Sequence, residues 1–175
     1  MTDSNTPPAV FAPRSVLHEH LTSWTAWRTA LVSGGGGALT ILILSGAADL
    51  SHAALLVAPF GASCVLVFAL PQSPLAQPKN VIFGHLISTA VGLAAFALFG
   101  AHPWSFALGV GLAIALMQIT GTLHPPAGAD PIVVILAKAA WPFLFTPVLV
   151  GAVAIVLAGL AYHRALSKRA YPVNQ

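Results

Sequence analysis

The phrase Pro59-Phe60-Gly61-Ala62-Ser63 returns later in the chain as Pro126-Ala127-Gly128-Ala129-Asp130. The first copy starts at residue 59 and the second at residue 126, a shift of 67 residues that also places Gly84 on Gly151 and Gly92 on Gly159. In both copies a Pro and a Gly interrupt an apolar run. This pattern is typical of membrane helices that are broken near the middle of the bilayer and form a site there.

The composition is that of an integral membrane protein. Of the 175 residues, 57% are hydrophobic and only 6% are charged, whereas about 25% of the residues in a soluble domain are charged. The seven Lys and Arg residues outnumber the four acids, and most of them lie at the chain ends or in one short loop. This distribution indicates orientation in a membrane and gives no indication of nucleic-acid binding.

Four uncharged runs are long enough to cross a bilayer, because about 20 helical residues cover a ~30 Å hydrocarbon core. They are residues 29–48, 81–100, 105–123 and 141–162. Two further runs, 53–70 and 124–137, are broken by Pro and Gly. The fold class predicted is therefore an all-α membrane protein with six membrane segments, four long and two broken. Each 67-residue unit holds three of them.

The predicted domain organisation has three parts. Residues 1–28 form an N-terminal tail and an interfacial amphipathic helix with Trp24 and Trp27 as anchors. Residues 29–163 form one transmembrane domain, with repeat one at about 29–95 and repeat two at about 96–163. Residues 164–175 form a basic cytoplasmic tail.

Small residues predict how the spans pack. Gly84, Ser88 and Gly92 recur at four-residue spacing and predict a helix-packing face in the third span. The glycines at 34–37 predict either a very close helix approach or a local break in the first span. Because these faces suit partners as well as neighbouring helices, we expect a homo-oligomer within the lipid bilayer.

The positions of the basic residues predict the topology. Arg14 and Arg28, then Lys79, then the C-terminal cluster should all be cytoplasmic. Both termini then lie inside, and the two units, with three crossings each, are inverted relative to each other. Since no secretory signal or transit peptide is evident before residue 29, we expect insertion into a bacterial inner membrane.

The two broken segments predict the binding site. Ser63 and Asp130 occupy equivalent repeat positions and both are good N-cap residues, so we expect a half-helix to begin at each. Two facing N-termini, each with roughly +0.5 charge, would favour a small anion. The predicted substrate-binding residues are Pro59, Gly61, Ala62, Ser63, His124, Pro125, Pro126, Gly128, Ala129 and Asp130.

Asp130 conflicts with an anion site, because its own charge would repel the ligand. Three resolutions stay open: the carboxylate caps its helix, it is protonated, or it is paired. His124 adjoins the second break, and an imidazole in the membrane indicates a functional site. The alternative for His124 is a neutral ring that is hydrogen-bonded to a nearby backbone carbonyl.

Further polar residues could line a pore. The candidates are Gln118, Thr120, Thr122, His85, Lys79 and Asn80, although a Thr commonly bonds its own helix carbonyls and His85 could simply be packed. The sequence shows no Ser, His and Asp in the order of a known hydrolase, no phosphate-binding loop and no Cys cluster. We therefore expect no enzyme, no cofactor and no metal site.

Three ordered motifs resemble the HPP family of integral membrane proteins. They are Ala58–Ser63, Leu70–Asn80 and the string His124–Pro131, which begins with the tripeptide that gives the family its name. The resemblance covers about residues 25–165. Plant chloroplast proteins that are similar to this family have been assigned nitrite transport, so the resemblance implies a carrier or channel for nitrite or a related small anion.

The leading hypothesis is therefore a transporter or channel for a small monovalent anion, with nitrite as the first candidate. One alternative is a proton- or cation-coupled carrier in which Asp130 is the working charge. Another is a membrane scaffold that transports nothing. A cavity at the broken helices would argue against the scaffold, and a fully packed centre would favour it.

Overall fold

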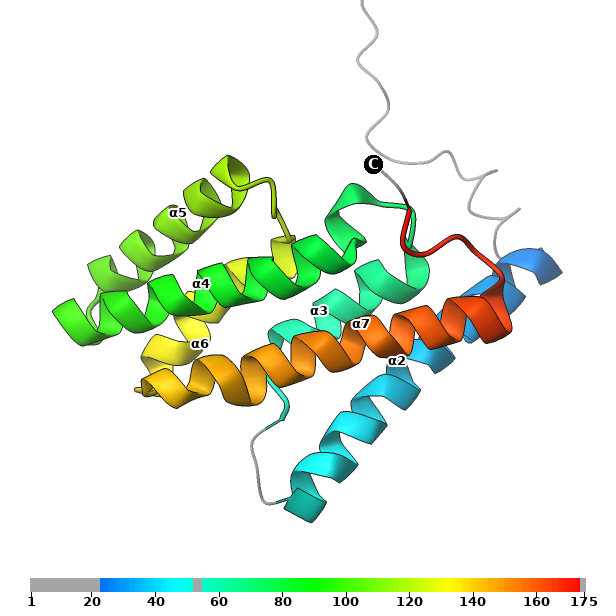
Figure 1. Cartoon of the computed structure of the whole chain (residues 1–175), viewed down its shortest axis with the longest axis horizontal. Helices are drawn as coiled ribbons and strands as arrows, with labels where there is room; N and C mark the ends of the chain where they lie inside the picture. The colour runs from blue at the N-terminus through cyan, green and yellow to red at the C-terminus, as the bar shows by residue number, and fades with distance from the viewer. Residues whose placement is uncertain (1–22, 52–54, 174–175) are drawn as a thin grey trace, which may run out of the picture.

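A computed structural model gives the architecture of the chain, and it describes residues 23–51 and 55–173. Within these ranges every regular element is a helix (Figure 1), so the predicted all-α class is confirmed for the described part. The predicted N-terminal tail and most of the interfacial helix fall on residues 1–22 and lie outside the described residues.

Three long apolar helices alternate with shorter ones. The long helices are α2 (Trp24–Ser51), α4 (Pro78–Phe99) and the composite helix Trp141–Ser167, which contains α7 (Val150–Tyr162). Each is long and apolar enough to cross a membrane. The shorter apolar segments are Pro59–Ala69, Pro103–Ile119 and Pro125–Leu136.

The shorter segments and the composite helix are assembled from several elements. Helices α3 (Pro59–Cys64) and η1 (Val65–Ala69) follow each other without a break. We keep the name first broken segment for these two, and second broken segment for η3 (Pro125–Ala129) and α6 (Asp130–Leu136). Between them lie η2 (Pro74–Ala76) and α5 (Pro103–Ile119). The composite helix is completed by η4 (Trp141–Leu144), η5 (Phe145–Leu149) and η6 (His163–Ser167).

Helix α4 begins and ends where its sequence requires. Pro78 occupies the first turn, where a missing N–H costs nothing, and it follows Gln77 in an extended conformation. At the other end Gly100 has a φ of 70°, which glycine adopts without strain, and the chain leaves the helix there. Both boundaries lie within three residues of the predicted span.

Helix α2 is continuous from Trp24 to Ser51, so it begins before and ends after the predicted span of residues 29–48. The helix is not broken at the glycines at 34–37, and of these Gly36 lies at a close approach. A Cβ added to Gly36 would lie 2.7 Å from a ring carbon of Phe68 and 2.9 Å from one of Tyr162. Helical order therefore extends through the glycines because two aromatic rings pack against the bare backbone.

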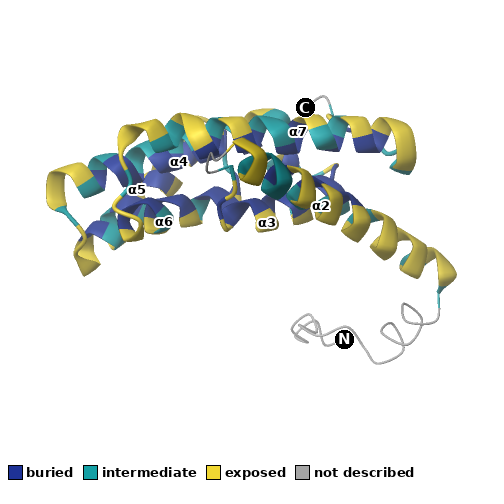
Figure 2. Cartoon of the chain, turned by 90° about the horizontal axis from the view of Figure 1, so that it is seen from below, coloured by how far each residue is buried: buried dark blue, intermediate teal, exposed yellow. Residues whose placement is uncertain are grey.

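Helix α4 lies in the centre of the bundle. It contacts α5, α6 and α7, and α7 runs beside it in the opposite chain direction (Figure 1). Buried residues concentrate where these helices meet α3, whereas most of α2 is exposed (Figure 2). In a membrane the exposed face of α2 would meet lipid or another chain, because its side chains are mostly apolar.

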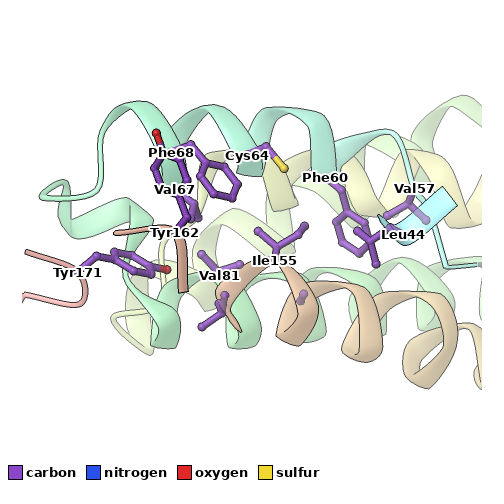
Figure 3. Packing of buried hydrophobic residues seen from close by; sticks show 12 residues of the cluster. Leu44, Val57, Phe60, Cys64, Val67, Phe68, Val81, Ile155, Tyr162 and Tyr171 are labelled. Carbon is purple, nitrogen blue, oxygen red and sulfur yellow. The ribbon is translucent and has the colours of Figure 1, made fainter. Parts of the chain in front are cut away.

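Large side chains fill the space between the first broken segment and α7. Phe60, Val67 and Phe68 project towards Ile155 and Tyr162 (Figure 3), and these residues belong to one buried cluster. The rings of Phe68 and Tyr162 meet edge to face with centroids 5.1 Å apart, a favourable geometry for aromatic pairs. The first broken segment is thus held by apolar packing along its whole length.

The long helix of each unit packs against the broken segment of the other unit. A Cβ added to Gly92 of α4 would lie 2.5 Å from Cγ2 of Val134, and one added to Gly159 of α7 would lie 2.5 Å from Cγ1 of Val67. Gly92 and Gly159 are 67 residues apart, and so are Val67 and Val134, so each residue of one pair has its repeat counterpart in the other pair. The repeat in the sequence is therefore also a repeat of contacts.

A second reciprocal pair supports the same relation. A Cβ added to Gly84 would lie 3.0 Å from the carbonyl oxygen of Thr122. A Cβ added to Gly151 would lie 3.2 Å from the carbonyl oxygen of Leu55. Thr122 and Leu55 are also 67 residues apart. The predicted packing role of Gly84 and Gly92 is confirmed, because backbone and side chains of the second broken segment occupy the space above both.

Candidate functional site

Four buried polar side chains form a continuous chain of contacts at the centre of the bundle. Asp130 Oδ2 lies 2.8 Å from His85 Nδ1, and Ser63 Oγ lies 2.8 Å from His85 Nε2 and 2.9 Å from His124 Nε2. Asp130 is 2% exposed and the other three are fully buried. We call Asp130, His85, Ser63 and His124 the polar tetrad.

The tetrad joins both broken segments to α4. Ser63 comes from α3, His85 from α4 and Asp130 from the first turn of α6, while His124 directly precedes η3. Ionisable and polar side chains at this depth are costly in hydrocarbon, and they persist where they satisfy one another. The site is therefore an internal polar centre that is shared by three helices distant in sequence.

The lack of a side chain at Gly84 allows His124 to approach α4. A Cβ at Gly84 would lie 2.7 Å from Cβ of His124, a distance at which one of the two must move. One turn further along, the Ser88 hydroxyl donates to the carbonyl of Ala127 at 2.5 Å. The same face of α4 thus both admits the second broken segment and holds it by a hydrogen bond.

The start of the second broken segment is anchored by two further contacts. Asn80 Nδ2 donates to the carbonyl of Leu123 at 2.9 Å, and His124 Nδ1 donates to the carbonyl of Leu75 at 2.7 Å. A carbonyl only accepts, so the proton on this His124 nitrogen is assigned by its partner. The predicted alternative, a ring that is hydrogen-bonded to a backbone carbonyl, is found for Nδ1 of His124. The other ring nitrogen, Nε2, contacts Ser63.

The predicted helix start at Asp130 is confirmed, the one at Ser63 was wrong, and neither side chain caps a helix. Helix α3 begins at Pro59, so Ser63 lies within it, and its hydroxyl is also 3.3 Å from the Pro59 carbonyl. Asp130 is the first residue of α6, and its carboxylate makes no cap hydrogen bond. The carboxylate is bound instead to His85, whose Nδ1 lies 2.8 Å from Oδ2.

The predicted binding residues separate into two groups. Pro59, Ser63, His124, Pro126 and Asp130 are buried. The others are exposed on the bundle or half-buried, namely Gly61, Ala62, Pro125, Gly128 and Ala129. The broken segments therefore turn one face to the polar tetrad and the other outwards.

The predicted pore-lining residues do not form one path. His85 belongs to the tetrad, and Asn80 anchors the second segment. The Thr122 hydroxyl is 2.7 Å from that of Thr120, which also donates to its own helix at Leu116. The remaining two, Lys79 and Gln118, are exposed.

A wide apolar groove lies beside the first broken segment. Its volume is about 1190 Å³, and it is lined by α2 on one side and by residues of α3 and η1 on the other, among them Gly61, Cys64 and Val65. Gly61 and Cys64 flank Ser63 in the chain, but the Ser63 side chain is turned the other way, towards the two imidazoles. The groove runs past the polar centre on the far side of α3.

Three tetrad members have the geometry of a Ser-His-Asp triad. Ser63 Oγ contacts one nitrogen of His85 and Asp130 contacts the other, as in serine hydrolases. The sequence analysis predicted no such arrangement, whereas the fold brings Ser63, His85 and Asp130 together from α3, α4 and α6. The Ser63 oxygen is enclosed by His85 and His124 and is inaccessible to solvent, so this conformation gives a substrate no approach to it.

We expect a serine-directed fluorophosphonate probe to leave Ser63 unlabelled, because the hydroxyl is fully buried. Labelling of the detergent-solubilised protein, compared with Ser63→Ala by mass spectrometry, tests this. A covalent adduct on Ser63 that is absent from the variant would support a hydrolase instead. Until then the absence of enzymatic activity stays a prediction, and so does the absence of a cofactor.

Within residues 23–51 and 55–173, no three His, Cys, Asp or Glu side chains are grouped so that they could hold a metal ion. Thr89, one turn after His85 on α4, is the other polar side chain near the Asp130 carboxylate. Its hydroxyl is buried and makes no hydrogen bond of standard geometry. The members of the tetrad therefore hydrogen-bond one another, and the Thr89 hydroxyl beside Asp130 is a further donor that is not used.

Comparison with known proteins identifies the family. The chain is 39% and 38% identical to two proteins of Dictyostelium discoideum that are named transmembrane proteins, each over 126 residues. The matches cover 67% of this chain but only 44% and 40% of those proteins, so the chain spans less than half the length of these relatives. No solved structure matches it. The model of the HPP transmembrane region matches residues 22–172, and the chain therefore belongs to the HPP family of transmembrane proteins.

Proposed function

We propose that the protein is a membrane transporter or channel for a small monovalent anion, with nitrite as the substrate to test first. The observation that carries this proposal is the polar tetrad, four side chains at most 2% exposed inside a family of membrane proteins. Buried ionisable groups in membrane segments mark ion pathways, because each is costly to insert and is retained for its chemistry.

The pairing of Asp130 with His85 supports an anion as the substrate. An isolated carboxylate would repel an anion, but a carboxylate bonded to an imidazole at 2.8 Å can share a proton and leave the pair neutral. Of the three resolutions considered for Asp130, the contact with His85 supports pairing, with the shared proton on either group. The proposed ion lies beside the tetrad and between the broken segments, at the hydrogen-bonding groups rather than at two helix ends.

The reciprocal glycine contacts support two units of opposite orientation. Each unit supplies one broken segment and the helix that covers the other unit's segment, and α4 and α7 run in opposite directions (Figure 1). In the proposed arrangement the six segments form two inverted repeats, a plan that places the site near the midplane. Both termini would face the cytoplasm of a bacterial inner membrane, and a homo-oligomer is part of this proposal.

Nitrite uptake into proteoliposomes tests the proposal. We expect uptake with the wild-type protein and a loss of about 100-fold in His124→Ala, because removing a positioned proton-transfer group has an effect of that size. His102→Ala, a change at an exposed histidine in the turn before α5, serves as the matched control. Protein-free vesicles give the background from membrane-permeant nitrous acid. Equal signals from wild type, His124→Ala and empty vesicles would refute anion transport.

Flux measurements in the same proteoliposomes distinguish anion transport from two other functions. A cation carrier that works through Asp130 is supported by the buried carboxylate, and it predicts cation flux that Asp130→Asn abolishes. A scaffold is supported by the complete burial of Ser63, His85 and His124, and it predicts no flux of either kind. Anion flux that depends on His124 would decide against both.

A further inference from the structure

The two ends of the tetrad fix where some of its protons lie. His124 donates from Nδ1 to the carbonyl of Leu75, so a neutral His124 presents a bare Nε2 to Ser63. At the other end His85 Nδ1 faces the carboxylate of Asp130. If that carboxylate is ionised and His85 is neutral, its Nδ1 carries the proton and its Nε2 is also bare.

This distribution leaves one contact without a proton. The Ser63 hydroxyl has a single hydrogen, yet it lies 2.8 Å and 2.9 Å from the Nε2 atoms of His85 and His124. With both nitrogens bare, one of these contacts would join two lone pairs in a site that water does not reach. Buried polar groups are almost always satisfied, so this state is disfavoured.

One additional proton on the Asp130–His85 pair satisfies every contact. Either His85 is an imidazolium beside a carboxylate, or Asp130 is a carboxylic acid that donates to Nδ1. In both forms His85 Nε2–H donates to Ser63, and Ser63 donates to His124. The tetrad is then neutral as a whole.

A second additional proton gives a less favourable state. Both imidazoles would donate to Ser63, and its hydroxyl would donate to the Pro59 carbonyl at 3.3 Å. That state carries a net positive charge in a buried site, which is costly without a counter-ion. The neutral state with one added proton is therefore the resting state of the empty site.

We propose that the tetrad holds one transferable proton on the Asp130–His85 pair and that Ser63 relays it to His124, so that protons move with the transported anion. The relay forms one O–H bond and one N–H bond and breaks one of each. Ser63 Oγ receives the proton of His85 Nε2 while its own proton passes to His124 Nε2. The coupling to an anion rests on the proposed function, whereas the stored proton does not.

The surroundings restrict the proton to this route. The ring of Phe60 meets that of His85 edge to face with centroids 5.2 Å apart, and Gly84 lies beneath His124. The titratable groups that face His85 are Asp130 on α6 and His124, with hydroxyls from Ser63 on α3 and Thr89 on α4. Past His124 the chain of contacts ends at Leu75, in the loop between the first broken segment and α4.

Nitrogen-15 NMR of histidine-labelled protein in nanodiscs tests the stored proton without any transport assay. The signals of His85 and His124 are assigned with His85→Gln and His124→Gln. At neutral pH we expect a proton on His85 Nε2, with either Nδ1 or Asp130 also protonated, and His124 protonated at Nδ1 only. An infrared carbonyl band that Asp130→Asn removes would identify the carboxylic acid form. A bare His85 Nε2 beside an ionised Asp130 would overturn the proposal.

Proton movement into vesicles tests the relay. With a pH-sensitive dye inside, we expect wild-type protein to dissipate an imposed pH gradient and to take up protons with nitrite, and Ser63→Ala to lose about 100-fold of this rate. Ser105→Ala is the matched control, because this hydroxyl is equally buried and makes no hydrogen bond. Thermal unfolding verifies that each variant is folded.

The two proposals fail in different ways. If no nitrite flux occurs but the NMR pattern is found, the proposed function fails and the stored proton stands. If nitrite flux is normal while Ser63→Ala, shown to be folded, moves protons at the wild-type ratio to nitrite, the relay is refuted and anion transport stands.

Discussion

Asp130→Ala is expected to lower the free energy of unfolding by about 3–5 kcal/mol, because it leaves one partner of a buried ion pair without the other. His85 and Asp130 are almost completely buried, with 2.8 Å between Nδ1 and Oδ2, so solvent cannot replace the lost contact. The same variant should abolish nitrite uptake. Unfolding in detergent, followed by circular dichroism, measures the first effect, and proteoliposomes measure the second.

A double variant separates stability from function. His85→Leu combined with Asp130→Val replaces the pair by apolar side chains of similar size, and such replacements are often neutral or stabilising. We therefore expect stability near that of the wild type together with no uptake. A loss below about 1 kcal/mol in Asp130→Ala alone, the range of an exposed pair, would contradict the buried pair.

Gly92→Ala is expected to destabilise the protein by about 1–3 kcal/mol or more, the usual cost of inserting an atom into a filled space. The new Cβ would lie 2.5 Å from both Pro131 Cα and Val134 Cγ2. Pro131 Cα is backbone, so α6 would have to move as a whole. Because α6 carries Asp130, uptake should fall as well.

Gly111→Ala in α5 is the matched control for this prediction. Nothing lies within 4 Å of a Cβ at Gly111, so the substitution should stabilise the helix by about 0.5–1 kcal/mol through lower backbone entropy in the unfolded state. Equal unfolding midpoints for Gly92→Ala and Gly111→Ala would show that α4 and α6 are not in close contact.

The repeat made much of the fold predictable. The phrases at 59–63 and 126–130 located both broken segments, and the spacing of Gly84, Ser88 and Gly92 identified the face of α4 that packs against the second one. These features are local patterns of small and helix-breaking residues, which act the same way in any membrane helix. The continuity of α2 was missed because it depends on Phe68 and Tyr162, which are distant in sequence.

The site was predicted only in part. Ser63, His124 and Asp130 adjoin the breaks and were identified, but their contacts were not, because capping is a local rule and the partner of Asp130 is 45 residues away. His85 was identified only as a pore-lining candidate that could simply be packed, because its repeat counterpart is Ala152. A signal was present: His85, Ser88 and Gly92 recur at three- and four-residue spacing, which places the imidazole on the face that packs against the second segment.

The exchanged glycine contacts have a consequence for how the two units depend on each other. Gly92 in the first unit contacts Val134 in the second, and Gly159 in the second unit contacts Val67 in the first. A unit on its own would therefore lack the contact that a glycine of the other unit makes with its broken segment. The polar centre depends on both units as well, because Ser63 of the first and Asp130 of the second meet at His85, whose counterpart in the second unit is Ala152.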